Sequence, residues 1–204
     1  MSSQEKAAQR EVLAEGKFLA FVREGRWEYV ERRGVRDVVF VVALTSEGRV
    51  LITEEYCPPV RCRVLGLPAG LVGDEKGGAK QEDPADADRR ELREETGYEA
   101  DELIFLMRGP TSTGVTSEVA NFFLAPNARR AGGQARRDQE LVQLHEIEVS
   151  GVAAWLKEQS GGRLVDPKVW TGLYLAGDRI PRSVLPAETV GTPHALSDRR
   201  GTTS

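Results

Sequence analysis

Three glutamates are spaced so that their carboxylates can share one face of a helix. Glu91 and Glu95 are four residues apart, and Glu94 lies three residues after Glu91, so the side chains project from adjacent turns. Like charges at this spacing repel, which a solvated helix surface tolerates. Converging carboxylates are also the oxygen ligands that a six-coordinate Mg²⁺ prefers. The spacing alone leaves open an exposed acidic face and a metal site.

The helix that carries these glutamates is the best-defined element in the sequence. Asp83 is a good N-cap, Pro84 suits the first helical position, and Gly97 follows the last one. We therefore expect a helix from Asp83 to Thr96. Three interleaved arginines could pair with an exposed acidic face, namely Arg89, Arg90 and Arg93.

The order of residues along this helix resembles the distal half of the Nudix box. The segment 90–98 reads RELREETGY, and it matches every fixed position of that motif: Arg-Glu, an aliphatic residue, any residue, Glu-Glu, any residue, Gly and an apolar residue. Glu82 stands where the family has another glutamate, and Gly70 is similar to the glycine that opens the box. The stretch between Gly70 and Glu82 is longer than is usual in the family. Because an insertion in a surface loop costs little closure entropy, we expect a lengthened loop around residues 73–81.

The resemblance implies a Nudix pyrophosphohydrolase that uses Mg²⁺ or Mn²⁺ and cleaves a nucleoside diphosphate linked to another moiety. By position in the box, Glu91 and Glu95 are expected to bind the metal, and Glu94 to be a further ligand or to orient the attacking water. The backbone carbonyl of Ala69 is an expected additional ligand. Arg90 is expected to hold the carboxylates by charge-assisted hydrogen bonds, with a plain surface ion pair as the alternative.

Flanking segments are similar to those of the ADP-ribose pyrophosphatase branch of the family. These are GLPAGL at 66–71, EYCPP at 55–59, and the loop STGVTSE at 112–118, which resembles a Ser-x-Gly-x-x-x-Glu loop. The expected substrate is therefore ADP-ribose or a related ADP-linked or nucleotide sugar, which would yield a nucleoside monophosphate and a sugar phosphate. The branch also implies a homodimer joined through the N-terminal strands.

Other activities stay open at this point. The chain has Gly66 and Cys57 where members of the branch often carry a glutamate and an arginine. A nucleoside triphosphate pyrophosphohydrolase would more often be shorter and lack the N-terminal hairpin, and a dinucleotide pyrophosphohydrolase is a further alternative. A coenzyme A pyrophosphatase would carry Pro-Gly-Gly, where this chain has Pro-Ala-Gly at 68–70. A noncatalytic Nudix-fold sensor of nucleotide sugars would usually have lost box carboxylates that this chain retains.

The general base is expected in an acidic loop. The resemblance to the branch implies a base from the segment DQE at 138–140, with Glu140 as the expected base and Asp138 as the alternative. An ordinary solvated loop is the competing interpretation. His145 lies in an alternating strand pattern and has no second histidine nearby, so we expect a structural role and no zinc site.

Substrate contacts are expected from cations near predicted strand or loop ends and from residues that match the branch. Each of the arginines could also be a solvated surface residue. Trp27 of the N-terminal hairpin could stack on adenine, or it could pack within its own subdomain or in a dimer contact. The candidate substrate-binding residues are Arg61, Arg63, Arg108, Gly70, Glu118 and Trp27.

The elements around the box helix alternate between strands and loops and end in two helices. The run VRDVVFVVAL at 35–44 has the nearly continuous apolar pattern of a buried strand. Further strands are expected as a hairpin at 17–30 and at 49–53, 64–67, 102–107, 118–124 and 142–149, with a basic loop at 129–137. Helices are expected at 151–159 and from Pro167, capped by Asp166, to about Ala176.

The fold class expected from the resemblance is α/β. It is a Nudix-type α/β/α sandwich in which a mixed β-sheet carries the box helix on one side and the C-terminal helices on the other. We expect three regions along the chain. They are a small N-terminal antiparallel β subdomain at 1–34 with a possible dimer contact, a Nudix domain at 35–177, and a flexible tail at 178–204.

Composition and charge limit the classes of function. With 40% hydrophobic and 29% charged residues the chain is typical of globular proteins, and its net charge of −4 gives no reason to expect nucleic acid or an anionic membrane as a partner. The N-terminus lacks a secretory pattern, so a cytoplasmic location is expected. Cys57 and Cys62 form neither a redox CxxC motif nor half of a zinc motif, and we expect two small core or loop residues.

Overall fold

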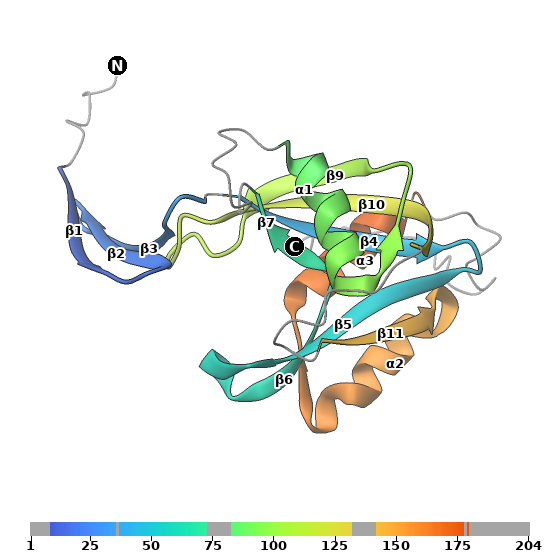
Figure 1. Cartoon of the computed structure of the whole chain (residues 1–204). Helices are drawn as coiled ribbons and strands as arrows, with labels where there is room; N and C mark the ends of the chain where they lie inside the picture. The colour runs from blue at the N-terminus through green and yellow to red at the C-terminus, as the bar shows by residue number, and fades with distance from the viewer. Residues whose placement is uncertain (1–8, 36, 73–82, 132–141, 178, 180–204) are drawn as a thin grey trace, which may run out of the picture.

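The computed structural model describes residues 9–35, 37–72, 83–131, 142–177 and 179. Within these ranges, nine strands form one sheet in the order β12-β6-β5-β4-β10-β8, with β11 paired to β5, β7 to β4 and β9 to β10 (Figure 1). The pairs β4–β10 and β6–β12 are parallel and the remaining pairs are antiparallel. The strands are β4 Asp37–Thr45, β5 Arg49–Cys57, β6 Cys62–Gly66, β7 Ala69–Leu71, β8 Tyr98–Glu99, β9 Ile104–Pro110, β10 Val119–Arg130, β11 Gln143–Glu148 and β12 Arg163–Val165. The helices are α1 Pro84–Glu91, α2 Val152–Glu158 and α3 Pro167–Gly177, with a π-helical segment η2 at Leu92–Thr96 and 3-10 segments η1 Pro58–Val60, η3 Val149–Gly151 and η4 Gln159–Gly161.

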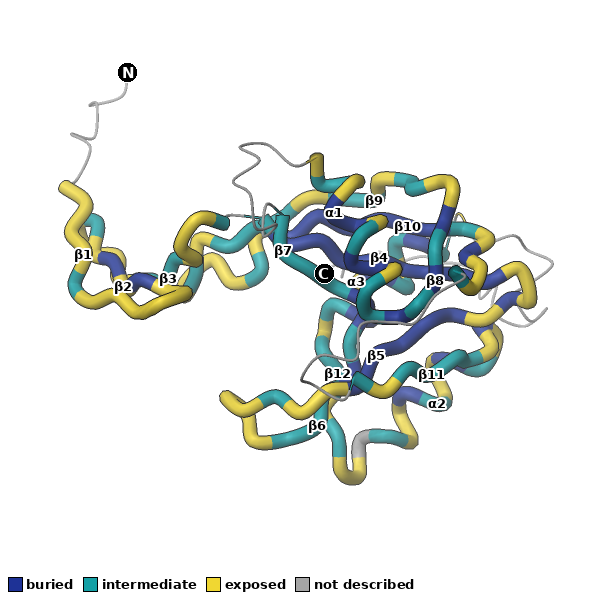
Figure 2. The backbone as a smooth tube through the Cα atoms, viewed as in Figure 1, coloured by how far each residue is buried: buried dark blue, intermediate teal, exposed yellow. Residues whose placement is uncertain are grey.

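Strand β4 lies inside the sheet and is buried on both faces (Figure 2). Val39 packs with Ala87 of α1 and Phe123 of β10 on one face. Phe40 and Val42 belong to the core on the other face, which includes residues of α2 and α3. Because helices cover both faces, neither face of β4 needs polar residues, which explains its nearly continuous apolar sequence. The predicted α/β class, with a mixed sheet between helices, is confirmed.

Helix α3 packs closely on the sheet at a glycine. A Cβ atom at Gly172 would lie 2.7 Å from Leu67 Cδ1 and 2.8 Å from Val42 Cγ2. Since real Cβ atoms do not approach other carbon atoms so closely, the absence of a side chain sets the spacing between α3 and β4. None of the helices in the described ranges has the length and apolar character needed to span a bilayer.

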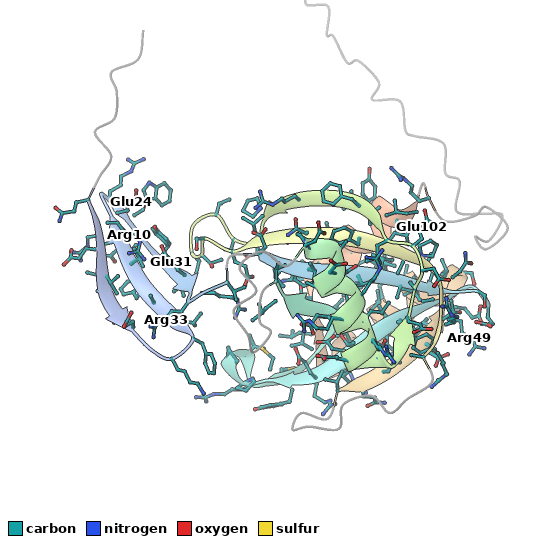
Figure 3. The ribbon with its side chains drawn as sticks, turned by 45° about the horizontal axis from the view of Figure 1, so that its top comes forward. Arg10, Glu24, Glu31, Arg33, Arg49 and Glu102 are labelled. Carbon is teal, nitrogen blue, oxygen red and sulfur yellow. The ribbon has the colours of Figure 1, made fainter. Side chains whose placement is uncertain are left out.

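A separate three-stranded antiparallel sheet is formed by β1 Arg10–Glu15, β2 Leu19–Glu24 and β3 Trp27–Arg32. Figure 1 shows it extending away from the main sheet. Gly25, with φ of 60°, forms the turn between β2 and β3, and Arg10 pairs with Glu31 across β2 at 2.7 Å (Figure 3). Hydrogen bonds from Val30 N to Val115 O and from Ser117 N to Val30 O, 2.8 and 3.1 Å long, attach this sheet to the loop before β10.

The structure differs from the sequence-based expectations in several of its strands. Strand β1 adds a third strand to the expected hairpin, and β7, β8 and β12 are short strands that were not predicted. Arg129 and Arg130 end strand β10 and so do not belong to the expected basic loop, and residues 132–137 of that loop lie outside the described residues. The expected tail at 178–204 lies outside the described residues except for residue 179.

Candidate active site

The helix that carries the glutamates begins as predicted. Asp83 Oδ1 accepts a hydrogen bond of 2.8 Å from Ala85 N, and Pro84 occupies the first helical turn. The last turn, however, is π-helical rather than α-helical, and Gly97 closes it with φ of 72°. A π-turn inserts extra backbone into the helix. Glu94 and Glu95 therefore point in directions that differ from those of an ideal α-helix.

Gly70 lies directly beneath the Glu91 side chain. A Cβ atom at Gly70 would be 1.8 Å from Glu91 Cγ and 2.3 Å from its Oε1. Any side chain there would displace the glutamate. The predicted opening glycine of the box is thus in contact with a predicted metal ligand, although the two are far apart in sequence.

Glu95 is held against the backbone of β7. Its Oε2 accepts a hydrogen bond of 3.0 Å from Ala69 N. Burial raises the pKa of Glu95 to about 8; the hydrogen bond from Ala69 N acts in the opposite direction, while the charges of Glu91 and Glu55 add to the increase. Glu95 lies close to the carboxylates of Glu91 and Glu55, so a nearby positive charge would stabilise its ionised form.

Arg90 joins the helix to β7. Its Nη1 donates to Glu91 Oε1 at 2.7 Å and lies 3.6 Å from Glu94 Oε2, and its Nη2 donates to Leu71 O at 3.2 Å. The guanidinium side chain is largely buried. One arginine therefore links two of the glutamates to β7, the strand that contains Gly70.

A small pocket of about 120 Å³ opens beside Glu95 and Ala69. Glu55, near the end of β5, also lines it, and sequence reasoning did not propose this glutamate for the site. In the sequence, the one hint for Glu55 is its position just after the strand expected at 49–53. The pocket is lined by Phe40, Thr53, Glu55, Val64, Gly66, Leu67, Ala69, Glu95, Val142, Asp166 and Lys168. Lys168 Nζ pairs with Asp166 Oδ2 at 2.8 Å.

A larger, more open cleft of about 630 Å³ lies along another side of the helix. Glu94 and Arg90 line it together with cations from the helix and from β10. Arg129 there pairs with Asp101 at 2.7 Å and with Glu99 at 3.2 Å. The open cleft is lined by four arginines and four acidic residues, whereas the small pocket contains the more deeply placed carboxylate of Glu95.

The donor set of this site suits a hard divalent cation. Glu91, Glu94, Glu95 and the Ala69 carbonyl offer oxygen ligands. The raised pKa of Glu95 has burial as its main cause, with a smaller contribution from the charges of Glu91 and Glu55. Among the described residues, no three acidic, histidine or cysteine side chains are already gathered in a metal-binding arrangement. Glu91 is turned toward Arg90 and Glu95 toward Ala69 N, so both side chains would turn to share a cation.

Asp88 is a buried carboxylate one helical turn before Glu91. It is fully buried, and neither of its oxygens has a hydrogen-bond partner within the described structure. Burial raises the pKa of Asp88 well above its usual value; Arg89 acts in the opposite direction and Glu91 adds to the increase. Burial therefore favours the uncharged form of the Asp88 carboxyl group.

Arg63 takes part in a buried ion cluster. Its guanidinium pairs with Glu54, a buried residue that also contacts Arg163 at 3.0 Å and His145 Nε2 at 2.8 Å. Burial alone would raise the pKa of Glu54, but hydrogen bonds from His145, Arg63 and Arg163 outweigh it and lower the pKa to about 2. The cluster joins β5, β6, β11 and β12. Arg63 and His145 thus hold strands together in this structure.

The other candidate substrate contacts are spread over the molecule. Arg61, with φ of 52°, ends the exposed turn after η1, and Arg108 pairs with Asp37 at 3.1 Å. Glu118 pairs with Arg32 and so joins the main domain to β3. Trp27 is 54% exposed on β3, in a sheet that Figure 1 shows apart from α1. Within one chain, Trp27 and the box glutamates are therefore not brought together.

Three acidic candidates cannot be placed. Glu82, Asp138 and Glu140 lie outside the described residues.

Together the fold and the site define an α/β domain in which a glutamate-rich helix packs over an Ala-Gly strand at the edge of a pocket. The chain belongs to the Nudix family, since the model of the NUDIX domain matches residues 34–163. The predicted family is therefore confirmed.

Two relatives show which members of the family this chain is similar to. The chain is 33% identical over 131 residues to the methanol dehydrogenase activator of Bacillus methanolicus, covering 64% of this chain and 66% of the relative. It is 33% identical over 110 residues to the ADP-ribose pyrophosphatase of Bacillus subtilis (strain 168), covering 53% of this chain and 56% of the relative. Less than two thirds of either relative is matched. The predicted resemblance to the ADP-ribose pyrophosphatase branch is confirmed by the second alignment.

The crystal structure of an ADP compounds hydrolase shares the fold. It superposes with a TM-score of 0.65 over 88% of this chain and 96% of that chain, at 18% sequence identity. At this identity the match bears on the fold alone.

Proposed function

We propose that this protein hydrolyses the pyrophosphate bond of a nucleoside diphosphate linked to another moiety. The preferred substrate is ADP-ribose or a related ADP-linked or nucleotide sugar, and the products are a nucleoside monophosphate and a sugar phosphate. The observation that carries the proposal is the packing of the Glu91 and Glu95 carboxylates on Ala69 and Gly70. Similarity to the Bacillus subtilis ADP-ribose pyrophosphatase supports the choice of substrate.

The residues have distinct roles in this proposal. Glu91, Glu95 and the Ala69 carbonyl hold Mg²⁺ or Mn²⁺, and Glu94 is a further ligand or orients the attacking water. When bound, the divalent cation supplies positive charge opposite the phosphoryl oxygens. Arg90 keeps Glu91 and Glu94 in position through the contacts described above. Breaking the phosphoanhydride bond requires the water to attack phosphorus and lose its proton to a base.

The remaining assignments complete the proposal. Glu140 is the proposed base. Arg61, Arg108, Glu118 and Trp27 are proposed to contact the substrate together with Gly70 and Arg63; Trp27 would do so from a second copy of the chain. We further propose a cytoplasmic homodimer that joins through the N-terminal sheet, acts on a small molecule, and has neither nucleic acid nor membrane as a partner.

The test is a substrate panel with Mg²⁺ or Mn²⁺. The panel contains ADP-ribose, ADP-glucose, GDP-mannose, NADH, a diadenosine polyphosphate and dGTP, and nucleoside monophosphate formation is followed by chromatography. We expect ADP-ribose to be the best substrate, with turnover abolished by a chelator and by Glu95→Gln. Glu158→Gln, at an exposed position on helix α2, is the matched control and should keep wild-type turnover.

Two outcomes would contradict the proposal. Turnover that survives Glu95→Gln would place the chemistry elsewhere. Binding of nucleotide sugars without any turnover across the panel would instead favour a noncatalytic sensor.

The similarity to the methanol dehydrogenase activator favours a second candidate function. In that case the chain would raise the activity of a dehydrogenase. Adding wild-type and Glu95→Gln protein to an alcohol dehydrogenase with NAD would test it, because an activator that works through hydrolysis loses its effect in the variant.

A further inference from the structure

The two cysteines of the chain face each other across a hairpin. Cys57 is the last residue of β5 and Cys62 the first of β6, and the strand register pairs them directly. Side chains of directly opposed residues lie on the same face of a sheet, with Cβ atoms about 4.5–5.5 Å apart. Both thiols are free and half-buried, and the sequence contains no other cysteine.

The turn between them is stiff. It consists of the 3-10 segment Pro58–Val60, followed by Arg61 in the left-handed region with φ of 52°. Two consecutive prolines fix their own φ angles, and Arg61 N donates to Pro58 O at 3.2 Å. The turn therefore keeps the two strand ends in register and limits how far the cysteines can separate.

The Cys62 thiol already has a partner across the sheet. Its Sγ lies 3.3 Å from Arg63 O and 3.7 Å from Gly162 O, the residue before β12. These are weak hydrogen bonds of a protonated thiol. They cost little to break, so rotation of the Cys62 side chain toward Cys57 is accessible.

We propose that Cys57 and Cys62 form a reversible intrachain disulfide when the protein meets a small-molecule disulfide such as oxidised glutathione. One cysteine, as its thiolate, attacks a sulfur of the oxidant, whose S–S bond breaks and releases one small thiol. The second cysteine then attacks the mixed disulfide, forms the Cys57–Cys62 bond and releases the other small thiol. The two cysteine protons end on the two released thiols, so the cysteines are oxidised and the oxidant is reduced.

The hairpin that this bond would close also builds the pocket beside Glu95. Glu55 of β5 lines that pocket together with Val64 and Gly66 of β6. The disulfide would lock the far end of these two strands. Oxidation would also remove the thiol hydrogen bond to Gly162 O and so loosen the contact between the hairpin and the start of β12.

The experiment equilibrates the folded full-length protein with oxidised and reduced glutathione, blocks remaining thiols, and analyses a tryptic digest by mass spectrometry. Trypsin cuts between Arg61 and Cys62 and so places the cysteines on separate peptides. We expect the two peptides to be recovered joined, lighter by two hydrogen atoms than the sum of the reduced pair, and separated again by reductant. Glutathione should not remain on the wild-type protein.

The single variants Cys57→Ser and Cys62→Ser serve as controls, and each should retain glutathione on its remaining cysteine. The proposal is overturned if the wild-type protein keeps glutathione on its cysteines without a joined peptide, or if it cross-links only between chains on a non-reducing gel. Circular dichroism of each sample confirms that the protein tested is folded.

Discussion

The surroundings of Glu95 disfavour its ionised form. The stability of the metal-free protein therefore depends on pH. Because burial raises its folded-state pKa to about 8, the folded state binds a proton that the unfolded state has released between pH 4.5 and 8. Stability is therefore present at low pH and is lost as pH rises through the folded-state pKa. We expect the free energy of unfolding to fall by about 2 kcal/mol between about pH 6 and pH 8.

Chemical denaturation in the presence of a chelator measures this loss. Glu95→Gln should have a smaller pH dependence, and saturating Mg²⁺ should reduce it in the wild type because the cation stabilises the ionised form. A wild-type profile that rises toward pH 8 without metal would contradict the assignment.

Asp88 leads to a second prediction about a single buried carboxylate. Replacing it with alanine removes two oxygens that have no hydrogen-bond partner in the described structure, and alanine also favours helix. Asp88→Ala should therefore stabilise the protein by about 1–3 kcal/mol, most strongly at high pH. Asp86→Ala, which removes an exposed ion pair with Arg89, is the control and should change stability little. A lower melting temperature for Asp88→Ala would show that Asp88 has a favourable partner.

Gly70 leads to a prediction about activity rather than stability. Gly70→Ala places a methyl group on the Glu91 side chain, so Glu91 must move away from the site. We expect kcat to fall by about 100-fold or more, since misplacement of a reacting group by about 1 Å has effects of this size, while the circular dichroism spectrum is retained. Gly151→Ala, where an added Cβ meets nothing within 4 Å, should have wild-type kcat. Equal activities of the two variants would argue against a role for Glu91.

At the scale of elements, the contact between α3 and the sheet depends on a glycine. Gly172→Val would push side-chain atoms into Leu67 and Val42, which already lie within 2.8 Å of a Cβ position. Overpacking of this kind costs about 1–3 kcal/mol, visible as a lower melting temperature. Gly177→Val, where there is no such neighbour, is the control. Equal melting temperatures would mean that α3 can shift at no cost.

The elements that sequence predicted are those with local signals. Asp83, Pro84 and Gly97 mark the ends of the box helix in the sequence itself. The nearly continuous apolar run of β4 is the pattern of a buried strand. The strands β7, β8 and β12 have two or three residues each. These strands form because they pair with partners distant in sequence, as Ala69 does with Phe40. Local propensity does not predict such pairs.

The residues of the candidate site likewise divide into those with a local sequence signal and those brought in by distant strand pairing. The order of residues in the box was sufficient to propose Glu91, Glu94 and Glu95. The proximity of Glu55 and the engagement of Arg63 with Glu54 depend on the pairing of β5 with β6 and β11, which no short pattern encodes. The π-helical turn was not predicted either, because the residues that favour it also favour an α-helix.

At the scale of the whole molecule, the N-terminal sheet presents apolar side chains to solvent. Leu19 and Phe21 alternate with the buried Ala20 and Val22 along β2 and are 45% and 39% exposed. If this sheet joins two chains as proposed, Phe21→Asp should convert a dimer to a monomer in light scattering. Tyr174→Asp, at an exposed position on α3, should leave the dimer intact. A monomeric wild type would contradict the proposed assembly.

The parallel pairing of β4 with β10 has a consequence for how the chain is made. Strand β4 is synthesised long before β10, and helix α1 lies between them in sequence. Ala87 packs against both Val39 and Phe123, so the helix cannot complete its packing until the second strand has left the ribosome. Until then the growing chain exposes a strand that is apolar on both faces. We therefore expect the nascent chain to be prone to aggregation during the interval between the synthesis of these two strands.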